Sequence, residues 1–302
     1  MLDTAKEMGY FPNAVARALK TNRSYNLGIL FMDENHSGLT HHFFMNVLNS
    51  FKKVAESNGY DITFIQQNIG TKPTTFLEHC LYRKVDGVCI ACLDFYTQEV
   101  QDLVNSPLPC VTIDHIFDNS TTVQSDNYDG MYRLTSYAIQ MGHRQIAYVH
   151  GQRSSVTERR VDGFRSALLD HGLPLSPSHL VASRYDSPEA GRQAIVSLLA
   201  LPNRPTCILM PDDISTLGAM NALTEHGIHS PADMSIAGYD GIPLTQMLTP
   251  QLTTIAQDTQ AMGAQAALAL INKVENPKTN HNVVISIEST LLTGHSIGKL
   301  VR

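Results

Sequence analysis

The stretch Leu27-Gly28-Ile29-Leu30-Phe31-Met32 reads as a short buried strand, and an amphipathic segment over residues 42–58 follows it. Gly59 stands at the end of that segment, where a glycine commonly stops a helix. The apolar residues of the segment recur at helical spacing: Phe44, Val47, Leu48, Phe51, Val54 and Ala55. A wholly apolar strand followed by an amphipathic helix is typical of a parallel sheet with both faces covered by helices.

The same alternation continues along the chain in two series. The first series places strands at 62–66, around Cys89 and at 110–113, with helices near 75–82 and 98–104. The second places helices at 126–140, 157–171, 188–201 and 212–226, with strands at 146–149, 207–210 and 235–239. An extended segment at 252–255, a helix over 259–274 and a final strand pair at 283–287 and 291–293 close the chain.

These two series predict an α/β fold of two doubly wound parallel-sheet lobes. The N-terminal lobe is predicted to comprise residues 25–124 and 256–281, and the C-terminal lobe 125–255 and 282–302, with residues 1–24 preceding both. In folds of this class ligands bind outside the carboxyl ends of the strands. We therefore expect a ligand cleft between the lobes.

Composition limits the class of protein. The 302 residues are 43% hydrophobic and 17% charged, as in a soluble globular protein of two domains. No apolar run approaches the roughly 18 residues that span a bilayer. The N-terminus lacks the basic and then apolar pattern of a secretion signal, which favours the cytoplasm and no membrane partner. Residues 1–24 hold four basic and two acidic side chains, whereas the whole chain has a net charge of −6.

Several short motifs resemble one known family. The segment Gly9-Tyr10-Phe11-Pro12-Asn13-Ala14-Val15-Ala16-Arg17-Ala18-Leu19 resembles the join between headpiece and regulatory core in the lac-repressor/gal-repressor family of transcriptional regulators. Six further motifs follow in the order and spacing of that family, at residues 59–61, 85–88, 142–147, 154–164, 212–219 and 236–240. Together they extend the resemblance over nearly the whole chain.

The resemblance implies a ligand-responsive DNA-binding regulator, most often a repressor, that is a homodimer with a periplasmic-binding-protein-like type I core. It also implies a hinge helix over 14–20 whose leucine wedges between base steps in the minor groove of operator DNA. The DNA-binding positions that match are Asn13, Arg17, Leu19 and Lys20. Most of a helix-turn-helix headpiece is expected to be missing before this point, so operator DNA is a partner when the headpiece is present. The alternative is an ordinary N-terminal helix.

The resemblance also implies the effector-binding residues. Arg160 matches the family's pocket arginine, a planar donor suited to hydroxyls, carboxylates or a purine edge. The acidic candidates are Asp114, Asp212, Asp213 and Asp240, and the stacking candidates are Phe43, Phe44 and Tyr185. Each has a structural alternative: a helix cap, a turn residue, an ion pair or a core aromatic.

The chemical identity of the effector stays open. Sugars are the commonest effectors of the family, but nucleobases and phosphorylated sugars remain alternatives. The chain departs from the family pattern at residues 38–44, at Gly241 and at Glu288, which line or flank the expected pocket. We therefore predict a small-molecule effector, most simply a sugar or sugar derivative.

Other chemistries have weaker support. Cys89 and Cys92 form a C-x-x-C within an apolar run, which we interpret as buried strand rather than a redox or metal motif. His41 and His42, with His36 or His115, lack the spacing of a metal site, so no metal and no cofactor is predicted. The sequence shows no catalytic signature, so no enzyme is predicted. The alternative function is an extracytoplasmic sugar-binding or solute-binding protein of the same fold, which needs a secretion signal and no basic hinge.

Overall fold

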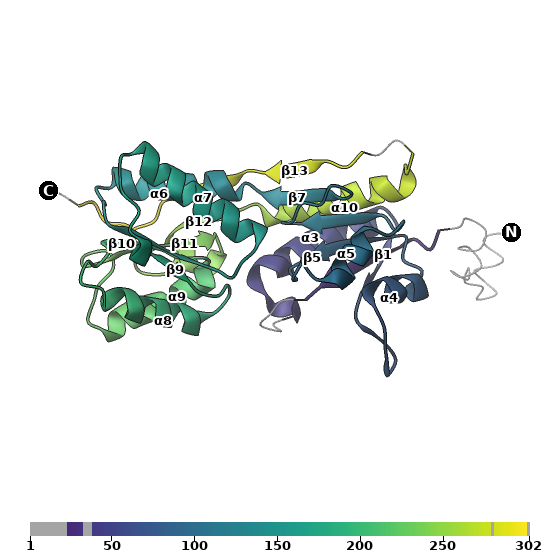
Figure 1. Ribbon diagram of the computed structural model, residues 1–302, viewed down its shortest axis with the longest axis horizontal. Coiled ribbons are helices and arrows are strands. Elements are labelled where there is room, and N and C mark those ends of the chain that lie inside the picture. The colour runs from purple at the N-terminus through teal and green to yellow at the C-terminus, as the bar shows by residue number, and fades with distance from the viewer. Residues whose placement is uncertain (1–22, 33–37, 279–280, 301–302) are drawn as a thin grey trace. The chain divides into compact units, whose positions relative to one another are not determined.

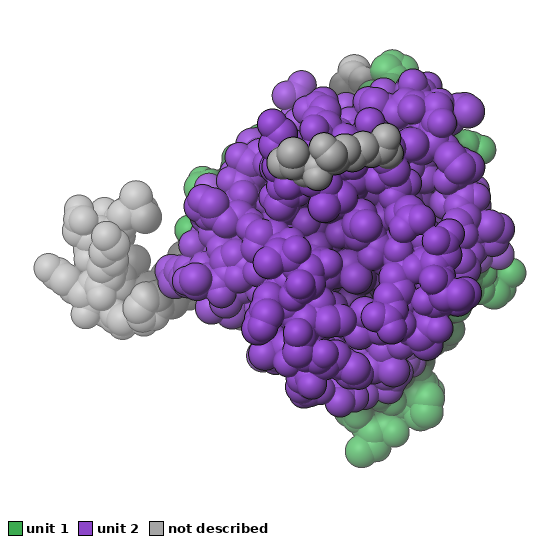
Figure 2. Space-filling model, turned by 90° about the vertical axis from the view of Figure 1, so that its left-hand side faces the viewer, with its two compact units in different colours: residues 1–38, 47–123, 263–285 green, residues 39–46, 124–262, 286–302 purple. Residues whose placement is uncertain are grey.

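The computed structural model describes residues 23–32, 38–278 and 281–300 (Figure 1). The chain divides into two compact units: unit 1 holds residues 1–38, 47–123 and 263–285, and unit 2 holds 39–46, 124–262 and 286–302 (Figure 2). Among the described helices, none is long and apolar enough to cross a membrane.

The described part of unit 1 is built on a six-stranded sheet with helices packed against it. Across the sheet the strands are β13 (Val284–Ile287), β7 (Thr121–Ser125), β6 (Cys110–Ile113), β5 (Gly87–Ala91), β1 (Asn26–Phe31) and β2 (Asp61–Phe64). The helices are α4 (Phe76–Arg83), α5 (Gln98–Val104) and most of α3 (His42–Ser57) and α10 (Thr259–Glu275). The first residues of α3 and α10 fall in unit 2, as does most of a short turn of helix η1 at Gly38–Thr40. β5 pairs in parallel with β1 and β6 and is buried along its whole length, as the central strand of a covered parallel sheet should be.

The described part of unit 2 repeats this plan. Its sheet has the order β14 (Ser289–Leu292), β12 (Thr253–Gln257), β11 (Ser235–Asp240), β10 (Cys207–Leu209), β8 (Ile146–His150) and β9 (Leu180–Ala182). Its helices are α6 (Asn127–Gln140), α7 (Ser155–Asp170), α8 (Pro188–Leu199) and α9 (Asp213–Glu225), with short turns of helix η2 (Pro177–His179) and η3 (Pro243–Met247).

Strand β8 shows why unit 2 has helices on both faces of its sheet. Ile146 and Tyr148 belong to one hydrophobic cluster, with residues of α6 and α7. Ala147 and Val149 belong to a second cluster, with residues of α8 and α9. Successive side chains of a strand point to opposite faces, so a wholly apolar strand requires a core on each side. The predicted doubly wound parallel-sheet fold is therefore confirmed.

The structure differs from the predicted elements at three places. Strands β7 and β9 and the small hairpin of β3 (Asn68–Ile69) with β4 (Lys72–Pro73) are present but were not predicted. The two C-terminal strands do not pair with each other: β13 lies beside β7, whereas β14 pairs antiparallel with β12. Cys92 lies just after β5, with a φ of 55°, so the C-x-x-C does not lie within one strand.

Candidate functional site

The carboxyl ends of the parallel strands in unit 2 form one edge of its sheet. Three helices begin beside this edge after β8, β9 and β10, and each starts at a capping side chain: Ser154 for α7, Ser187 for α8 and Asp212 for α9. Ligands of open α/β sheets bind outside this edge. The side chains gathered there are therefore the candidate site.

Arg160 of α7 is the only one of these candidates that carries a positive charge, and it is buried. Its Nε donates to Oδ1 of Asn127 at 2.7 Å, and its Nη1 donates to the carbonyl oxygen of Pro211 at 2.9 Å. Its guanidinium carbon lies 3.5 Å from the centre of the Tyr239 ring and 5.8 Å from that of Tyr185. Burial opposes the charge, but the nearby tyrosines and a carboxylate leave the pKa of Arg160 raised. The guanidinium is thus charged and fixed in orientation.

Asp240 supplies an acidic group at the same edge. It is the last residue of β11 and has a φ of 108°, which non-glycine residues rarely adopt. Its Oδ1 accepts a hydrogen bond from Nε2 of Gln257, at the end of β12, at 2.7 Å. Burial raises the pKa of Asp240 well above its usual range, while Arg160 acts in the opposite sense. A strained, half-buried carboxyl beside a fixed cation is a common arrangement in binding sites.

Tyr185 covers the site from the loop between β9 and α8. Its hydroxyl lies 2.9 Å from Oγ1 of Thr157, and its backbone N–H donates to Oε1 of Gln152 at 3.2 Å. A Cβ on Gly151 would overlap the Tyr185 ring, so the ring occupies space that only glycine leaves. The Tyr185 ring is therefore held in place before any ligand binds.

Two buried polar atoms in this region have no hydrogen-bond partner among the described residues. They are the hydroxyl of Tyr148 and Oε1 of Gln257. Burial raises the pKa of Tyr148. Tyr185 and Asp212 also raise this pKa, whereas the charge of Arg160 lowers it. Buried polar groups are seldom left unpaired in folded proteins, so these atoms are suited to hydrogen-bond a polar ligand.

Asp212 and Asp213 lie at the same edge, and both bond within unit 2. Asp212 accepts from the backbone N–H and the hydroxyl of Ser215, each at 2.7 Å, and so caps α9. Asp213 accepts from Oγ1 of Thr254 at 2.7 Å and from the backbone N–H of Ile242 at 2.8 Å. Burial raises the pKa of Asp212 and raises that of Asp213 to about 7. These contacts hold the loops around the site.

Of the remaining effector candidates, Asp114 lies in unit 1, whereas Phe43 and Phe44 fall within residues 39–46 of unit 2. Asp114 follows β6 in unit 1, has a φ of 63° and donates its backbone N–H to the carbonyl of Val123 at 2.9 Å. Phe43 and Phe44 are buried in the first turn of α3, edge to face with ring centres 4.9 Å apart. The structure thus brings together Arg160, Tyr185, Asp212, Asp213 and Asp240, all in unit 2.

Some candidates fall outside the described residues. The predicted DNA-binding positions Asn13, Arg17, Leu19 and Lys20 do so, as does His36. His41 packs against Phe44 with ring centres 5.1 Å apart. Within the ranges that the structure describes, no group of three or more histidine, cysteine, aspartate or glutamate side chains is arranged to hold a metal ion.

The residues that position Arg160 and Asp240 were missed by the sequence analysis. They are Asn127, Tyr148, Tyr239 and Gln257. Tyr239 and Gln257 lie in the last two positions of their strands, and Asn127 opens α6 directly after β7. Position at a strand end was the available signal, but a sequence does not show which strand ends meet.

Comparison with known proteins places the chain in a family. The family model for periplasmic binding proteins and the sugar binding domain of the LacI family matches residues 26–294. The HTH-type transcriptional repressor PurR of Pasteurella multocida is 30% identical, over 98% of this chain and 88% of its own. The ribose operon repressor of Haemophilus influenzae is 31% identical, over 97% of this chain and 87% of its own.

Solved structures agree with this result. A LacI transcriptional regulator from Bacillus cereus subsp. cytotoxis matches with a TM-score of 0.82 and 26% identity, over 91% of this chain and 99% of its own. A LacI family regulator from Enterococcus faecium with bound ribose matches with a TM-score of 0.78, over 91% of this chain and 100% of its own. The second is 24% identical, so it supports the fold alone.

Proposed function

Since the chain belongs to the LacI family of periplasmic-binding-protein-like sensors, we propose that it binds a small-molecule effector beside Arg160 and Asp240 and regulates transcription. Its curated relatives are named as repressors, which favours repression. A regulator of this kind needs a site whose occupancy changes the equilibrium between two states of the protein. No covalent step is required of any residue.

The observation that carries this proposal is the pairing of one fixed cation with buried acceptors. The guanidinium of Arg160 is held by Asn127 and Pro211 and lies on the Tyr239 ring. Asp240 supplies an acidic group at the same edge, and Gln257 an amide oxygen that has no partner among the described residues. Hydroxyl and N–H donors suit these acceptors, and the half-buried ring of Tyr185 suits an apolar ligand face.

This chemistry favours a neutral, polyhydroxylated effector, and we propose a sugar or a sugar derivative. Asp212, Asp213 and Asp240 bring three buried or half-buried carboxyl groups to this edge, which suit the hydroxyl donors of such a ligand. A purine base is the second candidate, because the planar donor group of Arg160 also suits a purine edge. Asp114, Phe43 and Phe44 remain proposed contacts of the same effector.

A thermal-shift screen tests the effector site. The panel contains ribose, cellobiose, ribose 5-phosphate, hypoxanthine and guanine, and the variants are Arg160→Lys and Asp240→Asn. A ligand at about 100 times its dissociation constant should stabilise the chain by about 2.7 kcal/mol. We expect a neutral sugar or a purine to give this shift, and both variants to weaken its binding at least tenfold or so, since each loses a charged hydrogen bond.

Arg192→Gln is the matched control. Arg192 is an exposed arginine of unit 2 that bonds Glu225 at 2.8 Å, away from the site. Its variant should bind like the wild type. A ligand that binds the wild type and both site variants equally would place the effector elsewhere.

We propose further that Asn13, Arg17, Leu19 and Lys20 contact operator DNA, that the protein is a homodimer and that it acts in the cytoplasm. Family membership supports these statements, and the basic side chains before residue 24 suit a polyanion. In a chain with a restored headpiece, changing Leu19→Ala should weaken operator binding and leave effector binding unchanged. Loss of both together would make Leu19 a packing residue.

A further inference from the structure

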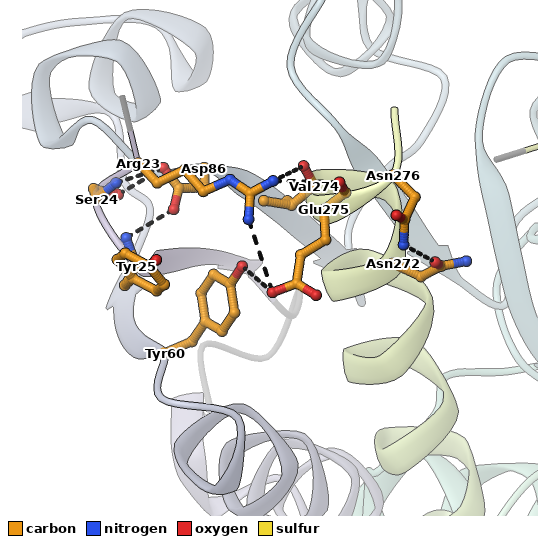
Figure 3. Close-up of polar contacts among 9 residues, drawn as sticks. All are labelled: Arg23, Ser24, Tyr25, Tyr60, Asp86, Asn272, Val274, Glu275 and Asn276. Carbon is orange, nitrogen blue, oxygen red and sulfur yellow. Dashed lines mark hydrogen bonds and ion pairs between the residues drawn. The ribbon is translucent and has the colours of Figure 1, made fainter. Parts of the chain in front are cut away.

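The described chain begins at a cluster of polar contacts that the effector site does not use. Arg23, Ser24 and Tyr25 precede β1, and they meet Asp86 and Glu275, two acidic residues that lie far from them in sequence (Figure 3). All five residues belong to unit 1. The segment proposed to bind DNA immediately precedes them.

Asp86 holds the backbone at the start of β1. Its Oδ1 accepts from the backbone N–H of Ser24 at 2.8 Å and from the Ser24 hydroxyl at 2.9 Å, and its Oδ2 accepts from the N–H of Tyr25 at 2.7 Å. A carboxylate that accepts three hydrogen bonds from consecutive residues fixes a tight turn. The turn is left-handed at Tyr25, whose φ is 56°. For a tyrosine this conformation persists only when surrounding contacts enforce it.

Backbone contacts secure the same turn from both neighbouring strands. The carbonyl of Tyr25 accepts from the N–H of Asp61 at 2.8 Å, next to β2. The carbonyl of Asn26 accepts from the N–H of Asp86 at 2.8 Å, next to β5. The turn is therefore attached to the sheet on both sides.

Glu275 and the end of α10 hold the side chain of Arg23. The guanidinium donates to the carbonyl oxygens of Val274 and Glu275 at 3.4 and 3.3 Å, and it lies 3.9 Å from the Glu275 carboxylate. The last carbonyls of a helix lack partners within the helix and favour a cation. An arginine fork suits both the carbonyls and the carboxylate.

Tyr60 connects the two halves of the cluster. Its hydroxyl donates to Oε1 of Glu275 at 3.2 Å, and its ring packs on Tyr25 with centres 5.6 Å apart. Tyr60 is buried, and burial with Glu275 raises its pKa to about 12, so the hydroxyl stays protonated and donates at neutral pH. The Glu275 carboxylate thus contacts both Tyr60 and Arg23.

From these contacts we propose that Asp86 and Glu275 form an anchor that fixes residues 23–25 on unit 1 and thereby positions the DNA-binding segment that precedes them. They are positioning residues, and Arg23 belongs to the anchor rather than to the phosphate contacts. The positioning role rests on the proposed function, whereas the anchor itself does not.

The proposed anchor should protect the intact chain from proteolysis at residues 23–25. Trypsin cleaves after Arg23 only when residues 23–25 leave Asp86 and Glu275, because the protease requires an extended substrate. Asp86→Asn and Glu275→Gln should each raise the initial rate of cleavage at Arg23–Ser24 about tenfold relative to cleavage at Lys20–Thr21. Glu275→Gln changes an exposed helix end, so this variant should fold even if Asp86→Asn does not.

Glu56→Gln is the matched control, since Glu56 is an exposed glutamate of unit 1 that pairs with Lys52 on α3. It should leave the cleavage ratio unchanged. An unchanged ratio in Glu275→Gln and Asp86→Asn as well would overturn the anchor. A change in melting temperature alone, without a change in the ratio, would reduce the cluster to ordinary packing and would also overturn it.

Titration of a short labelled duplex by fluorescence anisotropy separates the anchor from the proposed function. Removing an acidic charge should tighten DNA binding by simple electrostatics, as in Glu56→Gln. If the anchor positions the DNA-binding segment, the Glu275→Gln variant should instead bind DNA about threefold more weakly than the wild type. If Glu275→Gln tightens binding as the control does, the positioning role is wrong. If the wild type does not bind DNA, residues 13–20 alone do not suffice for binding without a headpiece, and the cleavage ratio still decides the anchor.

Discussion

Asp213 is a buried carboxyl at the candidate site whose protonation makes the stability of the fold depend on pH. It lies at the start of α9 and accepts hydrogen bonds from Thr254 and Ile242. Burial raises its pKa to about 7, although these hydrogen bonds act in the opposite sense. The folded state therefore binds this proton more tightly than the unfolded chain does. Its contribution to stability is complete below pH 4 or so and is lost as pH rises through about 7.

Asp213→Asn should remove this dependence. The free energy of unfolding of the wild type, minus that of the variant, should increase as pH falls from 7.5 to 5.5. The increase should be at most about 1.4 kcal/mol per pH unit. Denaturant titrations at three or four pH values measure it. A difference that does not change with pH would show that Asp213 is ionised throughout.

His79 should show the opposite dependence. It is fully buried on α4, and neither of its ring nitrogens has a hydrogen-bond partner among the described residues. Burial lowers its pKa, followed by the effect of Arg83, so the folded state loses stability as pH falls below about 6.5. His79→Leu should be at least as stable as the wild type at pH 7.5 and about 1 kcal/mol more stable at pH 5.5.

His143→Leu is the control for this prediction. His143 is also buried, but its ring nitrogens contact Oγ1 of Thr206 at 2.9 Å and the carbonyl of Gly298 at 3.1 Å. Its replacement removes both hydrogen bonds and should cost about 1–3 kcal/mol at pH 7.5. Calorimetry of the two variants compares them directly. Equal losses would mean that His79 has a partner.

At the scale of helices, Gly163 sets the distance between α6 and α7. A Cβ on Gly163 would overlap the backbone carbonyl of Tyr128, so the two helices touch at this point. Gly163→Ala should push α7, which carries Arg160, away from α6, which carries Asn127, and cost about 1–3 kcal/mol. Asp162→Ala, at an exposed neighbour in the same helix, should cost less than about 0.5 kcal/mol. A stable Gly163→Ala variant with unchanged effector binding would contradict this account.

The elements that could be predicted are those with a strong period. The α3, α5 and α10 segments carry helical spacing or good helix formers, and the buried strand β5 is apolar throughout. β7 escaped prediction because its sequence, Thr121–Ser125, is mostly polar although mostly buried. Its threonine hydroxyls form hydrogen bonds inside the protein: Oγ1 of Thr122 lies 2.9 Å from Oγ1 of Thr112. The pairing of β13 and β14 with different sheets depends on long-range contacts, which local pattern does not contain.

At the scale of the whole molecule, we predict a homodimer. The basis is the family resemblance given above, which implies a homodimer. Sedimentation at micromolar concentration should give twice the 33.3 kDa mass of the chain. Glu275→Gln should sediment identically, because the anchor lies within one chain. A monomer would argue against the proposed mode of DNA binding.

The candidate site could be predicted only in part. Arg160 and Asp240 followed from family motifs, the first within a predicted helix and the second at the end of a predicted strand. Their partners did not, because Asn127, Tyr239 and Gln257 come from α6, β11 and β12 and meet only once the sheet has formed. The same holds for Arg23: its basic charge suggests a phosphate contact, whereas the fold places it against the end of α10.

The tyrosines around Arg160 also have an optical consequence. The chain has 11 tyrosines and no tryptophan, so its intrinsic emission comes from tyrosine alone. Tyr239 and Tyr185 lie on the Arg160 guanidinium, and Tyr148 lies close enough to respond to its charge. A ligand that displaces Arg160 or bonds Tyr148 changes the surroundings of these three fluorophores without any label. Binding at the proposed site should therefore change the tyrosine emission of the chain.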